Sequence, residues 1–232
     1  MTVVRRELTQ GQWLEALGVD PFWIVDALPA VTAAEAGASI PIADVQRDAT
    51  ARDAAIKSCK QCDLARHRKQ SVPGAGDYKA EWLLVGEAPG AEEDVAGLPF
   101  VGKSGKLLDA MLAALDLKRD QGVYLTNAVK CHPEENRTPT SAEMDACNGY
   151  LNEQIAQIQP RVILALGRSA AYAVLGDEAP MQRLRGSVHY RQQGDQKIPV
   201  VVTYHPAYLL REPAEKWKAW QDLLLARKAL NA

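Results

Sequence analysis

The sequence lacks any apolar run that approaches the ~20 residues of a membrane-spanning helix. Residues 1–8 also lack the apolar stretch of a secretory signal peptide. The formal net charge is only -2, which argues against a strongly basic nucleic-acid binder. With 47% hydrophobic and 24% charged residues, the composition is that of an ordinary globular protein. We therefore expect a cytoplasmic protein without a membrane partner.

Acidic and basic residues are unevenly spread along the chain. Residues 1–55 carry four Lys or Arg and eight Asp or Glu, whereas residues 56–232 carry 23 basic and 21 acidic residues. The first segment also holds Pro29 and Pro41 among many small residues, which is typical of a linker. We expect an N-terminal extension and linker over 1–55, which either packs on the main domain, is partly disordered, or docks a protein partner. Residues 56–232 form the mildly basic main domain.

Short apolar runs alternate with helical patterns from residue 56 onwards, and this alternation predicts an α/β fold with a parallel sheet and helices on both faces. The runs carry few charges, as strands buried on both faces do. The predicted strands are 82–85, 123–126, 162–166 and 200–204. The predicted helices are 103–117, 141–158, 168–175 and 214–230. Thr140 and Glu143 predict a capping box at the start of the second helix.

A polar or glycine-rich segment follows each of the four predicted strands. Residues 86–94, after the first strand, contain two glycines, one proline and four acids. Asn127 follows the second strand, residues 167–169 the third and residues 205–211 the fourth. Because the carboxyl ends of parallel strands meet at one edge of a sheet, we expect these segments to converge in a ligand site. A loop that only connects two elements has no use for so many charges.

The cysteines favour a metal site. Cys59 and Cys62 have the C-x-x-C spacing that lets two thiolates grip one metal, whereas Cys131 and Cys147 are dispersed. Disulfides are rare in cytosolic proteins. Zinc sites usually present two close pairs, so one pair with two dispersed cysteines favours an iron–sulfur cluster over zinc and over unliganded buried thiols. Such a cluster would be either redox-active or a structural staple.

Residues 97–104 match the Walker pattern G-x-x-x-x-G-K-[ST] letter for letter. The match does not follow a strand directly, and the acids at 92–94 just before it would repel a triphosphate. Pro99 removes a backbone donor that a phosphate cradle needs. The sequence thus argues against a nucleoside triphosphatase. Lys103 and Ser104, at the start of a predicted helix, suit a single phosphate instead.

Five motifs occur along the chain in a fixed order. They are G-E-A-P-G-x-E-E-D from residue 86, G-x-P-F-V-G-x-S-G from 97, T-N-A-V-K-C from 126, N-R-T-P-T from 136 and H-P-A-Y-L-L-R from 205. Together they resemble the family-four uracil-DNA glycosylases over about residues 56–232. The resemblance implies a three-layer α/β/α sandwich with a four-stranded parallel sheet, and excision of uracil from single- or double-stranded DNA. It also implies a [4Fe-4S] cluster held by Cys59, Cys62, Cys131 and Cys147.

The resemblance further implies roles for individual residues. Phe100 would stack on a uracil flipped out of the helix. Asn127 would pair with uracil O4 and N3–H, and Glu93 would crowd C5, where thymine carries its methyl group. His205 would donate to O2 as the uracil anion leaves. Uracil binding is expected from Glu87, Ala88, Glu93, Phe100, Asn127 and His205, and catalysis from His205, Glu87 and Asn127. DNA contacts are expected from Lys103, Ser104, Arg137, Leu209, Leu210 and Arg211, with one of the leucines wedged into the base stack.

Each assignment has a structural alternative. Phe100 could be a core residue, Asn127 a turn cap, and His205 a structural hydrogen-bonding group. Arg211 could be a solvated charge. Ala88 stands where the family-one glycosylases carry an aspartate thought to position water, so Glu87 is the candidate for that task. No role is assigned to the other three histidines, His67, His132 and His189.

Competing functions follow from the same residues. Besides a hydrolytic repair glycosylase, the sequence allows a non-catalytic uracil- or DNA-binding module of the same fold and an iron–sulfur electron-transfer protein. Some relatives trap uracil-DNA covalently through a histidine in the loop between the last two cysteines. Residues 132–138 are short, with His132 beside Cys131, which favours hydrolysis. We expect a monomer in a bacterial or archaeal nucleoid, with residues 1–55 as a candidate tether to a replication or repair protein.

Overall fold

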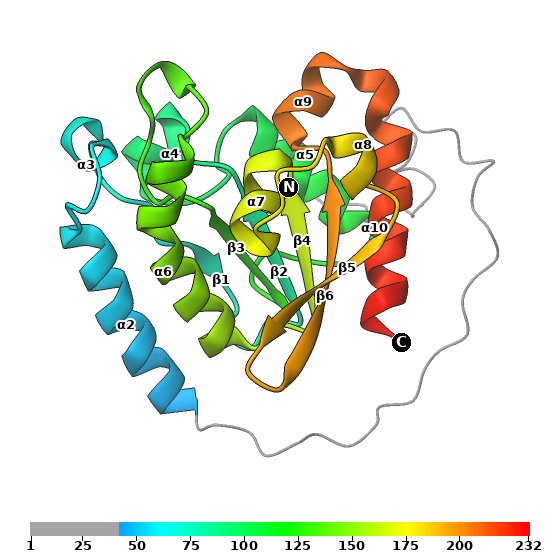
Figure 1. Ribbon diagram of the computed structural model, residues 1–232, viewed down its shortest axis with the longest axis horizontal. Helices are drawn as coiled ribbons and strands as arrows, with labels where there is room; N and C mark the ends of the chain where they lie inside the picture. Colours follow the sequence, from blue (N-terminus) through cyan, green and yellow to red (C-terminus); the bar gives the residue numbers. More distant parts are fainter. Residues whose placement is uncertain (1–41) are drawn as a thin grey trace, which may run out of the picture.

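The computed structural model describes residues 42–232, with side chains from residue 49 onwards (Figure 1). The expectations placed on residues 1–41, including the linker around Pro29 and Pro41, lie outside the described residues. Helix α2 (Ile42–Ser58) runs through the predicted boundary at residue 55 and packs beside α6 (Ser141–Ile158). The division into an extension and a main domain stays a prediction.

The described strands form one mixed, six-stranded sheet in the order β1-β3-β2-β4-β6-β5. Its centre consists of the four predicted strands, which run parallel: β2 (Trp82–Gly86), β3 (Val123–Asn127), β4 (Val162–Leu166) and β6 (Gln196–Thr203). The expectation of a four-stranded parallel sheet is wrong, because the sheet has six strands and is mixed. Strands β1 (Ala75–Gly76) and β5 (Val188–Gln193) pair antiparallel at its two edges.

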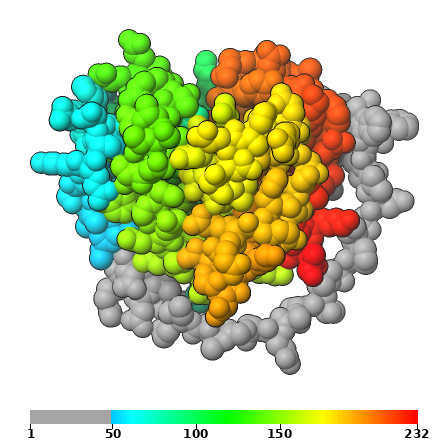
Figure 2. All heavy atoms as spheres, viewed as in Figure 1, coloured from blue at the N-terminus to red at the C-terminus, as the bar shows by residue number. Residues whose placement is uncertain are grey.

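Strand β5 escaped sequence-based prediction because it is a polar edge strand. Its side chains alternate between partly buried and exposed, so it never forms an apolar run. It forms a hairpin with β6 across Gly194, whose φ of 58° suits a tight turn. In Figure 2 the hairpin forms the golden to orange area at the lower centre of the visible face.

Helices cover both faces of the sheet and give three layers (Figure 1). On one face α6 and α7 (Arg168–Leu175) pack over Leu83 and Val85. On the other face α5 (Lys103–Ala113) and α10 (Lys216–Leu230) pack over Trp82 and Leu84. Neighbouring residues of β2 thus belong to different hydrophobic clusters, because successive side chains of a strand point to opposite faces. All residues of β2, β3 and β4 are buried, as their apolar runs predicted.

Several short helices shape the edge of the sheet at which the parallel strands end. The first is α4 (Ala91–Ala96), inside a segment that was expected to be a loop. The remaining short helices are α3 (Leu64–His67), α8 (Met181–Leu184), α9 (Pro206–Arg211) and 3₁₀ turns at Glu134–Asn136 and Pro213–Glu215.

The predicted capping box of α6 is confirmed: Glu143 N donates to Thr140 Oγ1 at 3.2 Å, and Thr140 N donates to Glu143 Oε2 at 2.8 Å. Within residues 42–232, no helix combines the length and apolarity needed to cross a bilayer.

Candidate active site

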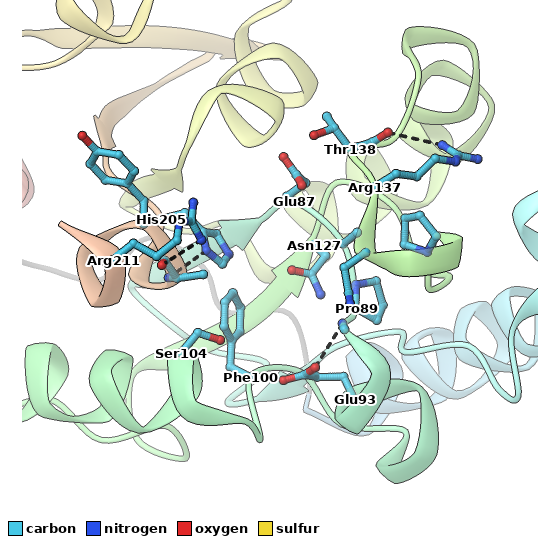
Figure 3. Close-up of a pocket in the computed structure, with 16 residues that line it drawn as sticks. Glu87, Pro89, Glu93, Phe100, Ser104, Asn127, Arg137, Thr138, His205 and Arg211 are labelled. Atoms are coloured by element: carbon cyan, nitrogen blue, oxygen red, sulfur yellow. Dashed lines mark hydrogen bonds between the residues drawn. The ribbon is translucent and has the colours of Figure 1, made fainter.

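A cavity of about 470 Å³ opens at the edge where the parallel strands end (Figure 3). The segment after β2 contributes Glu87 and Glu93, the end of β3 contributes Asn127, and the segment after β6 contributes His205. Phe100 comes from the loop between α4 and α5. The structure therefore brings together all six residues expected to bind uracil: Glu87, Ala88, Glu93, Phe100, Asn127 and His205.

Asn127 is buried at the end of β3 with a free acceptor. Its side chain is 2% exposed, and its Oδ1 has no hydrogen-bond partner among the described residues. Because an unpaired buried polar group is unfavourable, this oxygen suits a ligand that donates to it. Gly86 makes room for the arrangement, since a Cβ there would lie 2.3 Å from Asn127 Oδ1 and 2.5 Å from Phe100 Cζ.

Phe100 and Glu93 line the cavity beside Asn127 (Figure 3). The centroid of the Phe100 ring is 6.0 Å from that of His205. Glu93 is 8% exposed as a residue, and its carboxylate accepts hydrogen bonds from Gly90 N at 3.0 Å, Val101 N at 3.0 Å and Gly102 N at 3.1 Å. Glu93 therefore lines the cavity and also ties α4 to the Phe100 loop.

His205 is a neutral donor at physiological pH. Its Nδ1 accepts a hydrogen bond from Ala207 N at 3.2 Å, at the start of α9. Burial, reinforced by the charge of Arg211 and opposed by that of Glu93, lowers the pKa of His205 to about 4. A neutral imidazole whose Nδ1 accepts carries its proton on Nε2. The local backbone thus leaves an Nε2–H group for a ligand.

Glu87 has a partner that the sequence did not identify. Ser169 Oγ donates to Glu87 Oε2 at 2.5 Å, and Ser169 is 6% exposed. Ser169 lies in the first turn of α7, directly after β4, a segment already flagged for its place at the strand end but given no role. Gly167, with φ of 96°, makes the sharp turn into this helix. The pair fixes one carboxylate oxygen of Glu87 at the mouth of the cavity.

The predicted DNA-contacting residues fall into different environments. Ser104 and Arg211 line the cavity, and Arg211 Nη1 donates to Ala207 O at 3.1 Å. Leu209 is 1% exposed and belongs to the core, whereas Leu210 is 44% exposed. Leu210 is thus the one of the two leucines that is open to solvent. Lys103 is exposed at the start of α5 and does not line the cavity.

Arg137 lines the cavity, but its guanidinium points away from the centre (Figure 3). It donates to Glu143 through Nη1 at 2.8 Å and Nη2 at 2.6 Å. This bidentate pair, together with the amide of Thr140, lowers the pKa of Glu143 to about 2. Arg137 therefore fixes the end of the loop that borders the cavity.

The four cysteines gather around a second, very small cavity, together with Arg68, Lys130 and Tyr150. Cys59 and Cys62 lie between α2 and α3, Cys131 lies after β3, and Cys147 lies in α6. Arg68 Nη1 donates to Cys131 Sγ at 2.8 Å, and its Nη2 donates to Cys59 O at 3.0 Å. Burial raises the pKa of the Cys131 thiol to about 11 and raises those of Cys62 and Cys147.

The four cysteines come from three segments and lie around one cavity, so together they could hold an iron–sulfur cluster. In the described residues no three Cys, His, Asp or Glu side chains lie close enough to hold one metal ion, as zinc would require. An iron–sulfur cubane spreads its four thiolate ligands around a larger body. Four free thiols from three segments around one cavity fit that requirement.

Comparison with known proteins places this architecture in a family. A family model described as the uracil DNA glycosylase superfamily matches residues 73–224. The chain is similar to the type-4 uracil-DNA glycosylase of Archaeoglobus fulgidus, with 44% identity over 68% of this chain and 81% of the relative. It is also similar to that of Thermotoga maritima, with 42% identity over 67% and 80%. The type-5 enzyme of Thermus thermophilus is 36% identical over 58% and 68%.

Proposed function

The chain belongs to the uracil DNA glycosylase superfamily, and we propose that it is a type-4 enzyme that hydrolyses the N-glycosidic bond of uracil in DNA and leaves an abasic site. The carrying observation is that one cavity holds an aromatic face, an unpaired amide, a neutral imidazole donor and a carboxylate. These are the groups needed to hold a flipped pyrimidine and release it as an anion.

Base recognition would use two neighbouring residues of the cavity, Phe100 and Asn127. The Phe100 ring stacks on the uracil face, and the Asn127 amide pairs with N3–H and O4. The unpartnered Oδ1 of Asn127 supports this, because N3–H is the donor that uracil offers and cytosine lacks. A site built to pair with a substrate group rejects an analogue without it. Glu93 stands where C5 of the base would come and excludes thymine.

Bond cleavage would place negative charge on the departing base. As the C1′–N1 bond breaks, its electron pair goes to uracil, and His205 Nε2–H donates to O2. A donor aimed at a developing oxyanion typically contributes about 10²- to 10³-fold to kcat. The low pKa of His205 supports a neutral donor that stabilises the anion without giving up its proton.

Water would complete the reaction at C1′. Glu87 orients this water and takes its proton, while the water oxygen forms the new bond to C1′. The proton then returns to uracil N1, so that charge balances. The hydrogen bond from Ser169 supports this assignment, since it holds one oxygen of Glu87 and leaves the other for water.

DNA would be held along the mouth of the cavity. Exposed Leu210 is the wedge that fills the vacated position in the base stack. Arg211, Ser104 and Lys103 bind phosphates, and Arg137 supports the loop next to them. The substrate is uracil-containing DNA, single- or double-stranded, and the enzyme acts as a monomer in the cytoplasm. Residues 1–55 are a candidate tether to a replication or repair protein.

Cys59, Cys62, Cys131 and Cys147 would hold a [4Fe-4S] cluster. Such a cluster would link the α2–α3 segment to the segments around β3 and α6. Its role would be structural, and it would take no part in the hydrolysis. Arg68 supports its binding by donating to Cys131 Sγ. Positive charge from iron would also favour the thiolate forms, which burial alone disfavours.

Hydrolysis is favoured over covalent trapping by the position of His132. His132 Nε2 lies 3.0 Å from Asn136 Oδ1, and this histidine does not line the cavity, although Pro133 and Asn136 do. A covalent trap would need a histidine side chain at C1′.

The test is base release from labelled single-stranded oligonucleotides that carry one uracil, thymine or cytosine, followed by alkaline cleavage of abasic sites. We expect many turnovers on uracil alone. Binding without release would instead identify a binding module, and a DNA adduct that survives denaturation would identify a trap. A reversible cluster couple without any base release would favour the electron-transfer alternative.

A further inference from the structure

The backbone of the Phe100 loop is strained. Phe100 has φ of 56°, in the left-handed region that residues with a side chain rarely occupy. Gly105 is wedged against it, since a Cβ on Gly105 would lie 1.8 Å from Phe100 O. Such a conformation persists only where the surroundings fix it, and it often occurs where a side chain must be aimed. Contacts from other residues must therefore stabilise this backbone conformation.

Two charged side chains of opposite sign, Glu93 and Arg119, form hydrogen bonds to the backbone of this loop. Glu93 accepts from the amides of Val101 and Gly102, at 3.0 and 3.1 Å. Arg119 donates to two carbonyls of the same loop, Nη1 to Pro99 O at 3.0 Å and Nη2 to Phe100 O at 2.6 Å. Its Nη2 also donates to Gly105 O, in the first turn of α5, at 3.1 Å. The guanidinium fork therefore satisfies the acceptors of the loop, as the carboxylate satisfies its donors.

Arg119 is itself fixed. It lies in the tight turn between α5 and β3, where Gln121 N donates to Lys118 O at 3.2 Å. Its Nε pairs with Asp109 of α5. Gly76 of β1 packs close to this turn, since a Cβ there would lie 2.9 Å from Arg119 O. The side chain of Arg119 is 31% exposed and does not line the cavity.

We propose that Arg119 is a positioning residue for uracil recognition: its guanidinium holds the Phe100 backbone in the left-handed conformation that aims the ring into the cavity. The inference rests on the proposed function, because Phe100 must stack on the base for its aim to matter. Arg119 touches neither substrate nor reacting atoms. No residue pattern marked it, since it lies 19 residues from the phenylalanine that it serves.

A double-mutant cycle tests this proposal. We expect Arg119→Ala to lower kcat/KM about 10- to 100-fold, as small misplacements in active sites do. It should also weaken inhibition by free uracil, in the same direction as Phe100→Leu. Because Arg119 would act through Phe100, the double variant should be little worse than Phe100→Leu alone. Multiplying effects, or unchanged inhibition by uracil, would overturn the proposal.

Three further measurements separate positioning from general stability. Arg119→Lys should be intermediate, since a single ammonium nitrogen lacks the planar fork that reaches the three carbonyls and Asp109 at once. Guanidinium ion, at concentrations far below those that unfold proteins, should partly restore the activity of Arg119→Ala but not that of Phe100→Leu.

The control variant is Arg161→Ala. It also removes an arginine that is bonded to a carboxylate, that of Glu81, and to a backbone carbonyl, that of Leu230. It should keep wild-type kinetics. If Arg161→Ala loses as much activity, or guanidinium restores nothing, Arg119 has only a structural role.

The outcome also separates this inference from the proposed function. If the wild type releases no uracil, the proposed function fails before Arg119 is tested. If the wild type turns over and Arg119→Ala matches it in kcat/KM and in inhibition by uracil, only the positioning role is lost.

Discussion

The cavity lined by Glu87, Asn127 and His205 and the cysteine cluster (Cys59, Cys62, Cys131 and Cys147) are both assembled from distant segments, but they are held in different ways. In the cavity, protein groups orient the functional side chains: Ser169 binds Glu87, and Ala207 N binds His205. The cysteine cluster joins a peripheral segment, α2 and α3, to the body of the domain, and we propose that a metal cluster completes it. Loss of a cavity group should therefore affect chemistry, whereas loss of a cysteine should affect stability.

The largest effect is expected from His205→Ala. Without the Nε2–H donor, the uracil anion loses its stabilisation, and kcat should fall about 10²- to 10³-fold. Single-turnover base release measures this directly. The melting temperature should change little, because the imidazole faces the cavity. The control is His189→Ala, which removes a histidine bonded to Leu184 O, away from the cavity. Equal losses in the two variants would contradict the assignment.

Cys147→Ser tests the second half of the comparison, the expected role of the cysteine cluster in stability. With one ligand lost, the visible absorbance of the cluster should vanish, and we expect the melting temperature to fall by about 10 °C, corresponding to ~3 kcal/mol in a domain of this size. At a temperature well below melting, kcat should remain within about threefold of wild type, because the cavity keeps its own hydrogen bonds. Chelation of iron from the wild type should have the same effect. A fall in kcat as large as that of His205→Ala would break the comparison.

Ser169→Ala tests whether protein groups, rather than the substrate alone, orient the cavity. Removing the donor to Glu87 Oε2 should lower kcat about tenfold, the equivalent of one lost hydrogen bond to a charged group. KM should stay near wild type, because Ser169 is not expected to touch the base. Ser169→Thr, which keeps the hydroxyl, should recover part of the rate. Ser58→Ala removes a hydroxyl bonded to backbone of α2 and serves as control. A wild-type rate in Ser169→Ala would remove Glu87 from the water step.

The sequence predicted the elements that rely on local pattern. Each of the four central strands contains a short apolar run, and the capping box of α6 lies within four consecutive residues. Sequence patterns did not predict β5, because a half-exposed edge strand with alternating polar residues resembles a loop. The short helix α4 was missed for a related reason: its acids face backbone amides rather than solvent alone. Short-range patterns do not show such contacts.

The same limit applies to the site. Motifs led to Glu87, Asn127, Phe100 and His205, which the structure places around one cavity. Motifs did not lead to Ser169 or Arg119, which contact the Glu87 carboxylate and the Phe100 backbone, because both lie far away along the chain. Ser169 is 82 residues from Glu87 along the chain. Its position after β4 was the one available signal, since strand ends converge in a parallel sheet.

The smallest expected effect is the pH dependence of stability that His205 contributes. Burial lowers the pKa of His205 to about 4 from an ordinary value of 6.5, so the folded state binds the proton more weakly than the unfolded state. His205 therefore contributes stability that is present above pH 6.5 and is lost as pH falls towards 4. Between pH 7.5 and 5.5 the expected loss in unfolding free energy is about 1 kcal/mol. His205→Gln should lack this component, so urea unfolding of both proteins across that range isolates it. A difference between wild type and variant that is independent of pH would mean that the imidazole is solvated and charges freely, and that its hydrogen bond to Ala207 N does not fix the neutral form.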